Sequence, residues 1–204
     1  QSRVIVPATK NAGKIKEIQD MMRDLPVTVR SLADFPDVPD VEEDGATFAE
    51  NALKKARAIS QATGLTAMAD DSGLCVDALG GRPGVLSARY GGHFSSDMEK
   101  CLALLEELRD IPDEQRTARF VCVIALVDPT GRENVFEGTC EGIITREPHG
   151  GAGFGYDPVF YCEPLGCTFA ELTRAEKNRV SHRGMALRAV GEYLKHEGMT
   201  GAEG

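Results

Sequence analysis

The spacing of hydrophobic residues along the chain changes repeatedly between the period of a helix and that of a strand. Short apolar runs of the β type occupy residues 4–8, 66–69, 119–127 and 133–145. Helical spacing occupies residues 11–22, the segments that begin at Thr47 and Ser96, and residues 181–195. The polar segment 128–131 separates two of the strand runs and therefore predicts a hairpin.

Because helices and strands are interspersed and one strand pair is antiparallel, the pattern predicts an α/β fold with a mixed sheet. Residues 47–50 and 96–99 both have the form of a capping box, and Gly64 is expected to end a helix. Residues 80–92 and 149–157 are expected to be glycine-rich loops. Residues 198–204 are expected to form a frayed end.

Composition and charge restrict the function. The chain has 204 residues, of which 42% are hydrophobic and 27% are charged, which suits one domain or one domain of two lobes. The net charge of −9 argues against binding to long nucleic acid, which needs a basic surface. It does not exclude a small phosphorylated ligand, because a local basic pocket or a bound metal can overcome the overall charge.

The cysteines and the apolar runs bear on the compartment. The six cysteines form no CxxC pair, and we expect them to be reduced, structural thiols. No apolar run reaches the length of a membrane span, and the first residues do not resemble a signal peptide. We therefore expect a cytoplasmic protein without a membrane partner.

The first candidate motif follows the strand run 4–8 and opens a helix. It comprises Thr9, Lys10, Asn11, Ala12, Gly13 and Lys14. Unpaired backbone N–H groups and the helix dipole favour an anion at such a position, although the spacing is not that of a Walker A motif. The alternative is an ordinary capped helix with lysines on its surface.

An acidic segment, residues 69–73, follows the strand run 66–69. Successive side chains of a strand point to opposite faces, so only one of Asp70 and Asp71 should face a given site. Such a carboxylate can bind Mg²⁺ or accept a proton from water. The alternative is an acidic turn with an Asx hydrogen bond, in which an aspartate carboxylate accepts the N–H of Gly73. A second acidic cluster, residues 42–44, could share the same ion or simply be a solvated loop.

Two further segments could contact a ligand. Phe154, Gly155, Tyr156 and Asp157 lie in a glycine-rich loop, where backbone can approach a ligand and an aromatic ring can stack on a base. Lys177, His182 and Arg183 precede or begin the last helix and could donate to phosphate or to a carbonyl group. The alternatives are a turn with a half-buried aromatic residue and a helix capped by Ser181.

Taken together, these motifs resemble the inosine triphosphate pyrophosphatase family of the bacterial dITP/XTP type. The most specific strings are ADDSGL (69–74), ALGGRPGVLSARY (78–90), ITREPHGGAGFGYDP (144–158) and ELTRAEKNRVSHRG (171–184). The resemblance implies hydrolysis of ITP, dITP and XTP to the monophosphate and pyrophosphate, with Mg²⁺ as cofactor. It also implies a homodimer whose elongated subunits have two lobes and a central cleft that holds the site.

The resemblance assigns roles to individual residues. Residues 9–14 would hold the triphosphate, Asp71 would be the proton acceptor and a metal ligand, and Glu42 would be a second metal ligand. Ser72 would contact substrate, and residues 154–157, Lys177, His182 and Arg183 would line the pocket for the base and phosphates. Whether Asp71 acts as base, as metal ligand or as both stays open at this point.

One position departs from the family pattern. The first motif of the family usually reads T-G-N, and Lys10 replaces the glycine. If this position requires a positive φ, Lys10 costs on the order of 1 kcal/mol. Three other functions remain open: a house-cleaning pyrophosphatase for other modified nucleotides, a nucleotide-binding regulator without turnover, and a thiol or metal protein.

Overall fold

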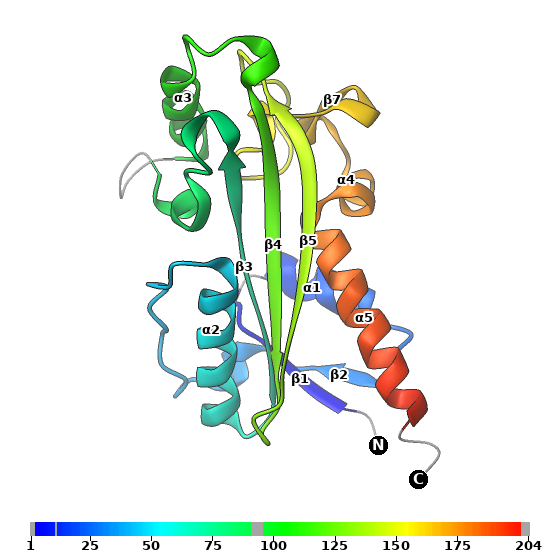
Figure 1. Cartoon of the computed structure of the whole chain (residues 1–204). Coiled ribbons are helices and arrows are strands. Elements are labelled where there is room, and N and C mark those ends of the chain that lie inside the picture. The colour runs from blue at the N-terminus through cyan, green and yellow to red at the C-terminus, as the bar shows by residue number, and fades with distance from the viewer. Residues whose placement is uncertain (1–2, 11, 91–95, 201–204) are drawn as a thin grey trace. The chain divides into compact units, whose positions relative to one another are not determined.

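The strands of the chain form one mixed sheet. The computed structural model describes residues 3–10, 12–90 and 96–200, and in it a seven-stranded sheet has the order β2-β1-β3-β4-β5-β6-β7 (Figure 1). The strands are β1 Arg3–Pro7, β2 Val27–Val29, β3 Thr66–Val76, β4 Thr117–Val127, β5 Glu133–Ile144, β6 Phe160–Cys162 and β7 Cys167–Thr168. β1 pairs in parallel with β2 and β3, whereas β6 pairs antiparallel with β5 and β7. The prediction of a mixed-sheet α/β fold is confirmed.

The hairpin and four of the five described α-helices lie close to where the sequence pattern predicts them, and the helix Arg174–Val180 was not predicted. The α-helices are α1 Ala12–Met21, α2 Phe48–Thr63, α3 Asp97–Glu107, α4 Arg174–Val180 and α5 His182–Thr200. β4 and β5 are joined by a tight turn in which the N–H of Asp128 donates to the carbonyl of Arg132 over 3.1 Å. Two features differ from expectation. Helix α5 continues to Thr200, and a 3₁₀ helix occupies Gly84–Arg89, where a loop was expected.

The chain divides into two compact units. Unit 1 comprises Gln1–Asp71, Cys122–Glu137 and Ala186–Gly204, and unit 2 comprises Ser72–Val121 and Gly138–Met185. The chain passes from unit 1 to unit 2 directly after Asp71, within β3. Each unit has its own hydrophobic core and is described separately.

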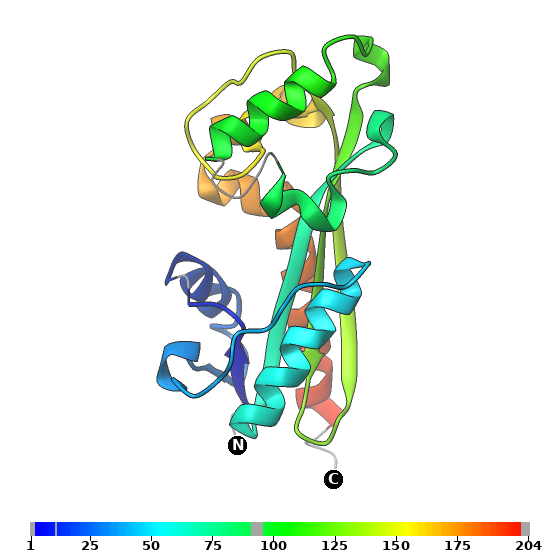
Figure 2. The ribbon, with the colours of Figure 1, turned by 90° about the vertical axis from the view of Figure 1, so that its left-hand side faces the viewer.

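In unit 1, helix α2 lies along the first half of β3 (Figure 2). It begins because the Thr47 hydroxyl accepts a hydrogen bond from the N–H of Glu50, and it ends at Gly64, whose φ of 69° suits glycine. The expected capping box is only half formed, since the Glu50 carboxylate accepts from the N–H of Ala46 instead of that of Thr47. The bend before the helix brings Ala46 within reach of that carboxylate.

In unit 2, aromatic side chains fill the core. Phe120, Phe160 and Phe169 lie within 5.6 Å of one another, measured between ring centroids. Helix α3 packs Cys101, Leu104 and Leu108 into the same core. It starts with the predicted capping box between Ser96 and Glu99.

All six cysteines are free thiols, and four of them are buried, in agreement with the expectation of reduced, structural cysteines. Within the described residues, no helix is both long enough and apolar enough to cross a bilayer.

Candidate active site

The acidic segment lies inside a strand and not after one. β3 runs unbroken from Thr66 to Val76, so Asp70 and Asp71 are in its middle. This overturns both the position expected at the end of a strand and the alternative of an acidic turn at Gly73. The strand continues past the acids because the side chains of Leu74 and Val76 are buried in the core of unit 2. Ser72, the next residue after Asp71, is exposed.

Two polar side chains of α2 face this part of β3. Asn51 is 1% exposed, and its Nδ2 donates a hydrogen bond to Oδ2 of Asp71 over 3.0 Å. One turn later on the helix, Nζ of Lys55 donates to the backbone carbonyl of Asp70 and forms an ion pair with Glu43, both at 2.5 Å. Residues four apart lie on one face of a helix, so α2 presents both groups to the acidic segment.

Asn51 also fixes the chain before α2. Its Oδ1 accepts a hydrogen bond from the N–H of Gly45 over 2.7 Å. A Cβ atom at Gly45 would lie 2.7 Å from that same oxygen, so the close approach requires glycine. Asn51 therefore connects the acidic loop 42–45 to Asp71.

The environment of Asp71 raises its proton affinity. Burial raises the pKa of the Asp71 carboxyl above its ordinary value, and the nearby charges of Glu43 and Asp70 act in the same direction. The hydrogen bond from Asn51 and the charge of Lys55 oppose this rise in pKa. A carboxylate with a raised pKa is a better proton acceptor than an exposed aspartate, which suits a general base.

Of the two glutamates before α2, Glu43 is the one that contacts the polar residues around Asp71. Glu43 is half-buried, pairs with Lys55 and acts electrostatically on Asp71, whereas Glu42 is exposed. No group of three or more His, Cys, Asp or Glu side chains among the described residues is arranged to hold a metal ion. Mg²⁺ commonly uses only one or two carboxylates together with substrate phosphates, so the donors at Asp71 and Glu43 fit this ion.

The first motif follows the strand next to β3. β1 and β3 are parallel, with Pro7 opposite Met68, and the N–H of Ala8 donates to the carbonyl of Met68 over 2.8 Å. Pro7 and Met68 are paired, and Thr9 and Asp70 each lie two residues beyond them, so the first motif follows β1 beside the acidic segment of β3. α1 begins directly behind, with no acidic residue in its first turn, as an anion site requires.

The substitution of Lys10 for glycine causes no backbone strain. No described residue other than glycine has a positive φ, and Lys10 is an exposed, described residue. Lys10 is therefore compatible with the local backbone. Asn11 lies outside the described residues, and Ala12, Gly13 and Lys14 form the start of α1.

In unit 2, the loop 153–157 presents one aromatic ring to solvent and buries the other. Phe154 is 61% exposed, whereas Tyr156 is buried in the core and its hydroxyl donates to the carbonyl of Ser87 over 2.5 Å. Of the two aromatic residues, Phe154 is therefore the one placed to stack on a base. Gly155 has a φ of 59°, which suits glycine.

Asp157 and Lys177 form a buried pair behind Phe154. The Asp157 carboxylate is 2.5 Å from Nζ of Lys177 and accepts the N–H of Phe154 over 3.0 Å. Burial raises the pKa of the Asp157 carboxyl, while the Lys177 charge and the N–H of Phe154 act against this rise. Nζ of Lys177 also lies 4.3 Å from the centre of the Phe154 ring. The Asp157 carboxylate is thus bonded to Lys177 and to the backbone of Phe154, and Lys177 packs against the Phe154 ring.

The remaining predicted residues begin α5. The Ser181 hydroxyl accepts the N–H of Gly184 over 3.0 Å, which confirms the predicted cap. The His182 ring stacks on Phe120 at 4.7 Å between centroids and is nearly buried, while Arg183 is half-buried.

The sequence analysis did not name Asn51 and Lys55, which contact the acidic segment, or Asp97, which accepts the N–H of Gly155. Of the two glutamates it named Glu42. A signal for the first two existed, because Asn51 and Lys55 are polar residues four apart on a helix. The contact of Asp97 with the loop 153–157 joins residues 58 positions apart, and the sequence pattern has no such signal.

Comparison with known proteins agrees with this description. A model of the Ham1 family matches residues 5–193. A dITP/XTP pyrophosphatase of Geobacter sulfurreducens is 52% identical over 96% of this chain and 98% of its own length. One from Geobacillus kaustophilus is 54% identical over 92% of each chain. The solved structure of a HAM1 protein from Coxiella burnetii matches with a TM-score of 0.91 and 45% identity, over 95% of this chain and 99% of that one.

The mixed seven-stranded sheet and its helices make this an α/β protein with the fold of the solved Coxiella burnetii relative. The chain belongs to the Ham1 family. The family resemblance inferred from the motifs is confirmed.

Proposed function

We propose that this protein is a nucleoside triphosphate pyrophosphatase that hydrolyses dITP, XTP and ITP to the monophosphate and pyrophosphate. The names of relatives that are about half identical over nearly the whole chain support this proposal. The observation that carries it in the structure is the half-buried Asp71, which is oriented by Asn51 and whose pKa is raised by burial.

Asp71 serves as the proton acceptor. Hydrolysis requires a water oxygen to attack the α-phosphorus, the bond from that phosphorus to the bridging oxygen to break, and the water to lose a proton. Asp71 takes this proton, and the Asn51 hydrogen bond fixes the direction of its carboxylate. Lys55 places positive charge beside the acids, which limits repulsion between Asp70, Asp71 and an anionic substrate.

The carboxylates of Asp71 and Glu43 are the residues that would hold Mg²⁺, with Glu42 as the alternative from the sequence. When bound, Mg²⁺ supplies positive charge that neutralises the triphosphate. Lys55 pairs with Glu43 and donates to the backbone carbonyl of Asp70, so it connects Glu43 to the strand that carries Asp71.

The segment 9–14 receives the phosphates. It combines the N-terminus of α1 with the side chains of Thr9, Lys10 and Lys14, and it follows β1 beside the strand that carries Asp71. Lys177 is expected to contact the phosphates and also supports the aromatic ring, through its contacts with Asp157 and Phe154.

The base is recognised by residues of unit 2. Phe154 provides the stacking surface, and Arg183 with His182 supplies donors for the 6-keto group of hypoxanthine or xanthine. Adenine has an amino group at this position and would leave those donors without an acceptor. Ser72 contacts substrate next to Asp71.

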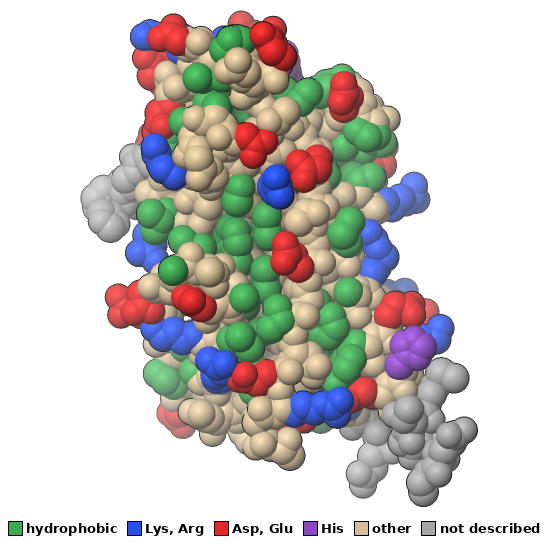
Figure 3. All heavy atoms as spheres, in the orientation of Figure 1, with side chains coloured by type: hydrophobic (Ala, Val, Ile, Leu, Met, Phe, Trp, Pro, Cys, Tyr) green, Lys and Arg blue, Asp and Glu red, His purple; other side chains and the backbone are tan. Residues whose placement is uncertain are grey.

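The protein acts as a cytoplasmic homodimer that removes non-standard purine nucleotides before polymerases use them. Free thiols suit a reducing compartment. Figure 3 shows hydrophobic side chains gathered on a face over β4 and β5, and Val135 of β5 is 46% exposed. Light scattering coupled to size-exclusion chromatography distinguishes a dimer from a monomer.

Pyrophosphate release tests the proposed function. The protein is assayed with ITP, dITP, XTP, GTP and ATP, each with and without Mg²⁺. We expect release from the first three only, and only with the metal. Turnover of modified pyrimidine or methylated nucleotides in its place would assign another house-cleaning activity, and tight binding without release would assign a regulator.

A further inference from the structure

One helix of unit 2 binds the loop that carries Phe154. Oδ2 of Asp97, the first residue of α3, accepts a hydrogen bond from the N–H of Gly155 over 2.9 Å. Sγ of Cys101, one turn further along, donates to the carbonyl of Gly155 over 3.4 Å. Both backbone polar groups of Gly155 are therefore bonded to the same face of α3.

The loop also closes on itself, because the N–H of Asp157 donates to the carbonyl of Phe154 over 3.2 Å. It belongs to no strand, and Gly153 and Gly155 have φ angles of 75° and 59°, so no β-ladder sets its course. On the other side of Phe154, the N–H of that residue is bonded to Asp157. Two successive backbone N–H groups are thus bonded to carboxylates: that of Phe154 to Asp157 in the loop, and that of Gly155 to Asp97 of α3.

The position of the Phe154 ring depends on these bonds. The ring is 61% exposed, so packing of its own surface restrains it only in part. Lys177 contacts the ring, and Asp157 fixes Lys177. The direction of the ring is then set by the backbone at residues 154 and 155, which Asp157 and Asp97 hold.

We propose that Asp97, assisted by Cys101, is a positioning residue that fixes the Phe154 ring for stacking on the substrate base. The inference rests on the proposed function in so far as Phe154 is the surface for the base. Asp97 touches neither the substrate phosphates nor Asp71 in this scheme, so its loss weakens binding of the base and leaves the chemical step in place.

Kinetics of three variants test the inference. Asp97→Ala removes the acceptor for the N–H of Gly155, and we expect KM for ITP to rise about fivefold to tenfold while kcat changes less than twofold. Asp97→Asn keeps an oxygen that can accept this N–H, and we expect it to restore KM to within about twofold of the parent.

Glu99→Ala is the matched control. Glu99 is also acidic, lies in the same turn of α3 and closes its capping box, but its carboxylate accepts the N–H of Ser96. We expect its KM to match that of the parent even where its melting temperature falls. An equal rise of KM in Glu99→Ala would assign the effect to the stability of α3 and overturn the inference.

A fluorescence measurement tests the position of the loop without any activity. The chain contains no tryptophan, so Phe154→Trp introduces a single indole at the stacking position. We expect added Asp97→Ala to lower the steady-state anisotropy of this indole and to increase its quenching by acrylamide, and added Asp97→Asn to change neither.

The two tests separate the inference from the proposed function. If the parent releases no pyrophosphate from any purine triphosphate, the proposed function fails, and the fluorescence result still decides whether Asp97 holds the loop. Unchanged anisotropy and quenching in the Asp97→Ala background would overturn the inference even in an active enzyme.

Discussion

Nδ2 of Asn51 lies 3.0 Å from Oδ2 of Asp71 and donates a hydrogen bond to it. The two residues come from α2 and β3, and the same Asn51 side chain accepts the N–H of Gly45 through its other polar atom. Asp71, the proposed proton acceptor, is thus held by Asn51, which is only 1% exposed. This arrangement fixes the direction of the Asp71 carboxylate and lowers its pKa against the larger, opposite effect of burial.

Replacing Asn51 should alter the pH dependence of the reaction. The Asn51 hydrogen bond lowers the pKa of Asp71 against the effect of burial, so Asn51→Ala should raise this pKa further. The base works only when deprotonated, and the acidic limb of kcat/KM should therefore move to higher pH, most clearly at low Mg²⁺, because a cation bound to Asp71 itself lowers this pKa. We expect kcat to fall about tenfold to a hundredfold as well, because the carboxylate loses its fixed direction. A pH profile at constant Mg²⁺ measures both, and an unmoved acidic limb would contradict this role.

Asp71→Asn should abolish most of the turnover and leave the fold intact. The amide keeps the size of the side chain but accepts no proton at neutral pH, so kcat should fall by about 10³-fold or more. Circular dichroism should match that of the parent. A rate near that of the parent would remove Asp71 from the centre of the mechanism.

Two adjacent lysines of α2 should differ in importance. Lys55 contacts Glu43 and the carbonyl of Asp70, whereas Lys54 pairs with Asp44 at an exposed position. We expect Lys55→Met to lower kcat/KM by about tenfold to a hundredfold, since the acids lose their compensating charge. Lys54→Met is the control and should stay within about twofold of the parent. Equal effects would point to the charge of the helix as a whole.

The requirement for Mg²⁺ should distinguish the two glutamates before α2. Glu43 acts on Asp71 and Glu42 is exposed, so Glu43→Gln should raise the Mg²⁺ concentration for half-maximal activity by about tenfold. Glu42→Gln should leave it nearly unchanged. The reverse order would restore the ligand that the family motif suggested.

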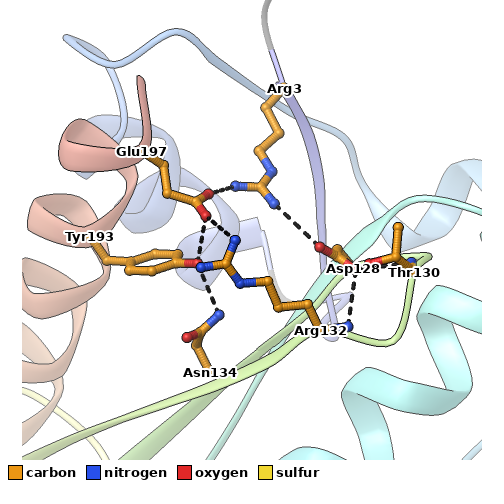
Figure 4. Close-up of polar contacts among 7 residues, drawn as sticks. All are labelled: Arg3, Asp128, Thr130, Arg132, Asn134, Tyr193 and Glu197. Atoms are coloured by element: carbon orange, nitrogen blue, oxygen red, sulfur yellow. Dashed lines mark hydrogen bonds and ion pairs between the residues drawn. The ribbon is translucent and has the colours of Figure 1, made fainter. Parts of the chain in front are cut away.

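Stability in acid should depend on Glu197 of α5. Its carboxylate accepts the Tyr193 hydroxyl over 2.7 Å and pairs with Arg132 at 3.0 Å and with Arg3, in a network that Asn134 and Asp128 extend (Figure 4). Burial alone would raise the pKa of Glu197, but the hydrogen bonds from Tyr193 and Arg3 and the charges of both arginines lower it below its ordinary 4.5.

A lowered pKa in the folded state means that this stabilisation is complete above about pH 4.5 and is lost as the pH falls through the folded pKa. Glu197→Gln should therefore lower the melting temperature at pH 7 by about 2–4 °C, the shift expected for about 1 kcal/mol, and by less near pH 3. Glu192→Gln, an exposed residue of the same helix, is the control. A difference from the parent that does not change with pH would contradict the role of the charge.

The sequence by itself determined the family and the longer elements, whereas the short strands β2, β6 and β7 and the helix α4 were not predicted. The apolar spacing of residues 119–127 and 133–145, the turn 128–131, the cap at Ser181 and the capping box at Ser96 all appear as predicted, because these features depend on residues close together in the chain. The motif strings identified the family for the same reason, since each is a short contiguous run.

Only the tertiary structure decided how the side chains of the site are paired. Periodicity predicts which face of a helix is buried, but not which strand residue it meets, and the Asn51–Asp71 bond follows from the packing of α2 on β3. Packing likewise brings Glu43 and not Glu42 to Lys55, turns Asp157 toward Lys177, and places Asp97 at Gly155. Burial of the residues after Asp71 also makes the segment that resembled a turn the middle of a long strand.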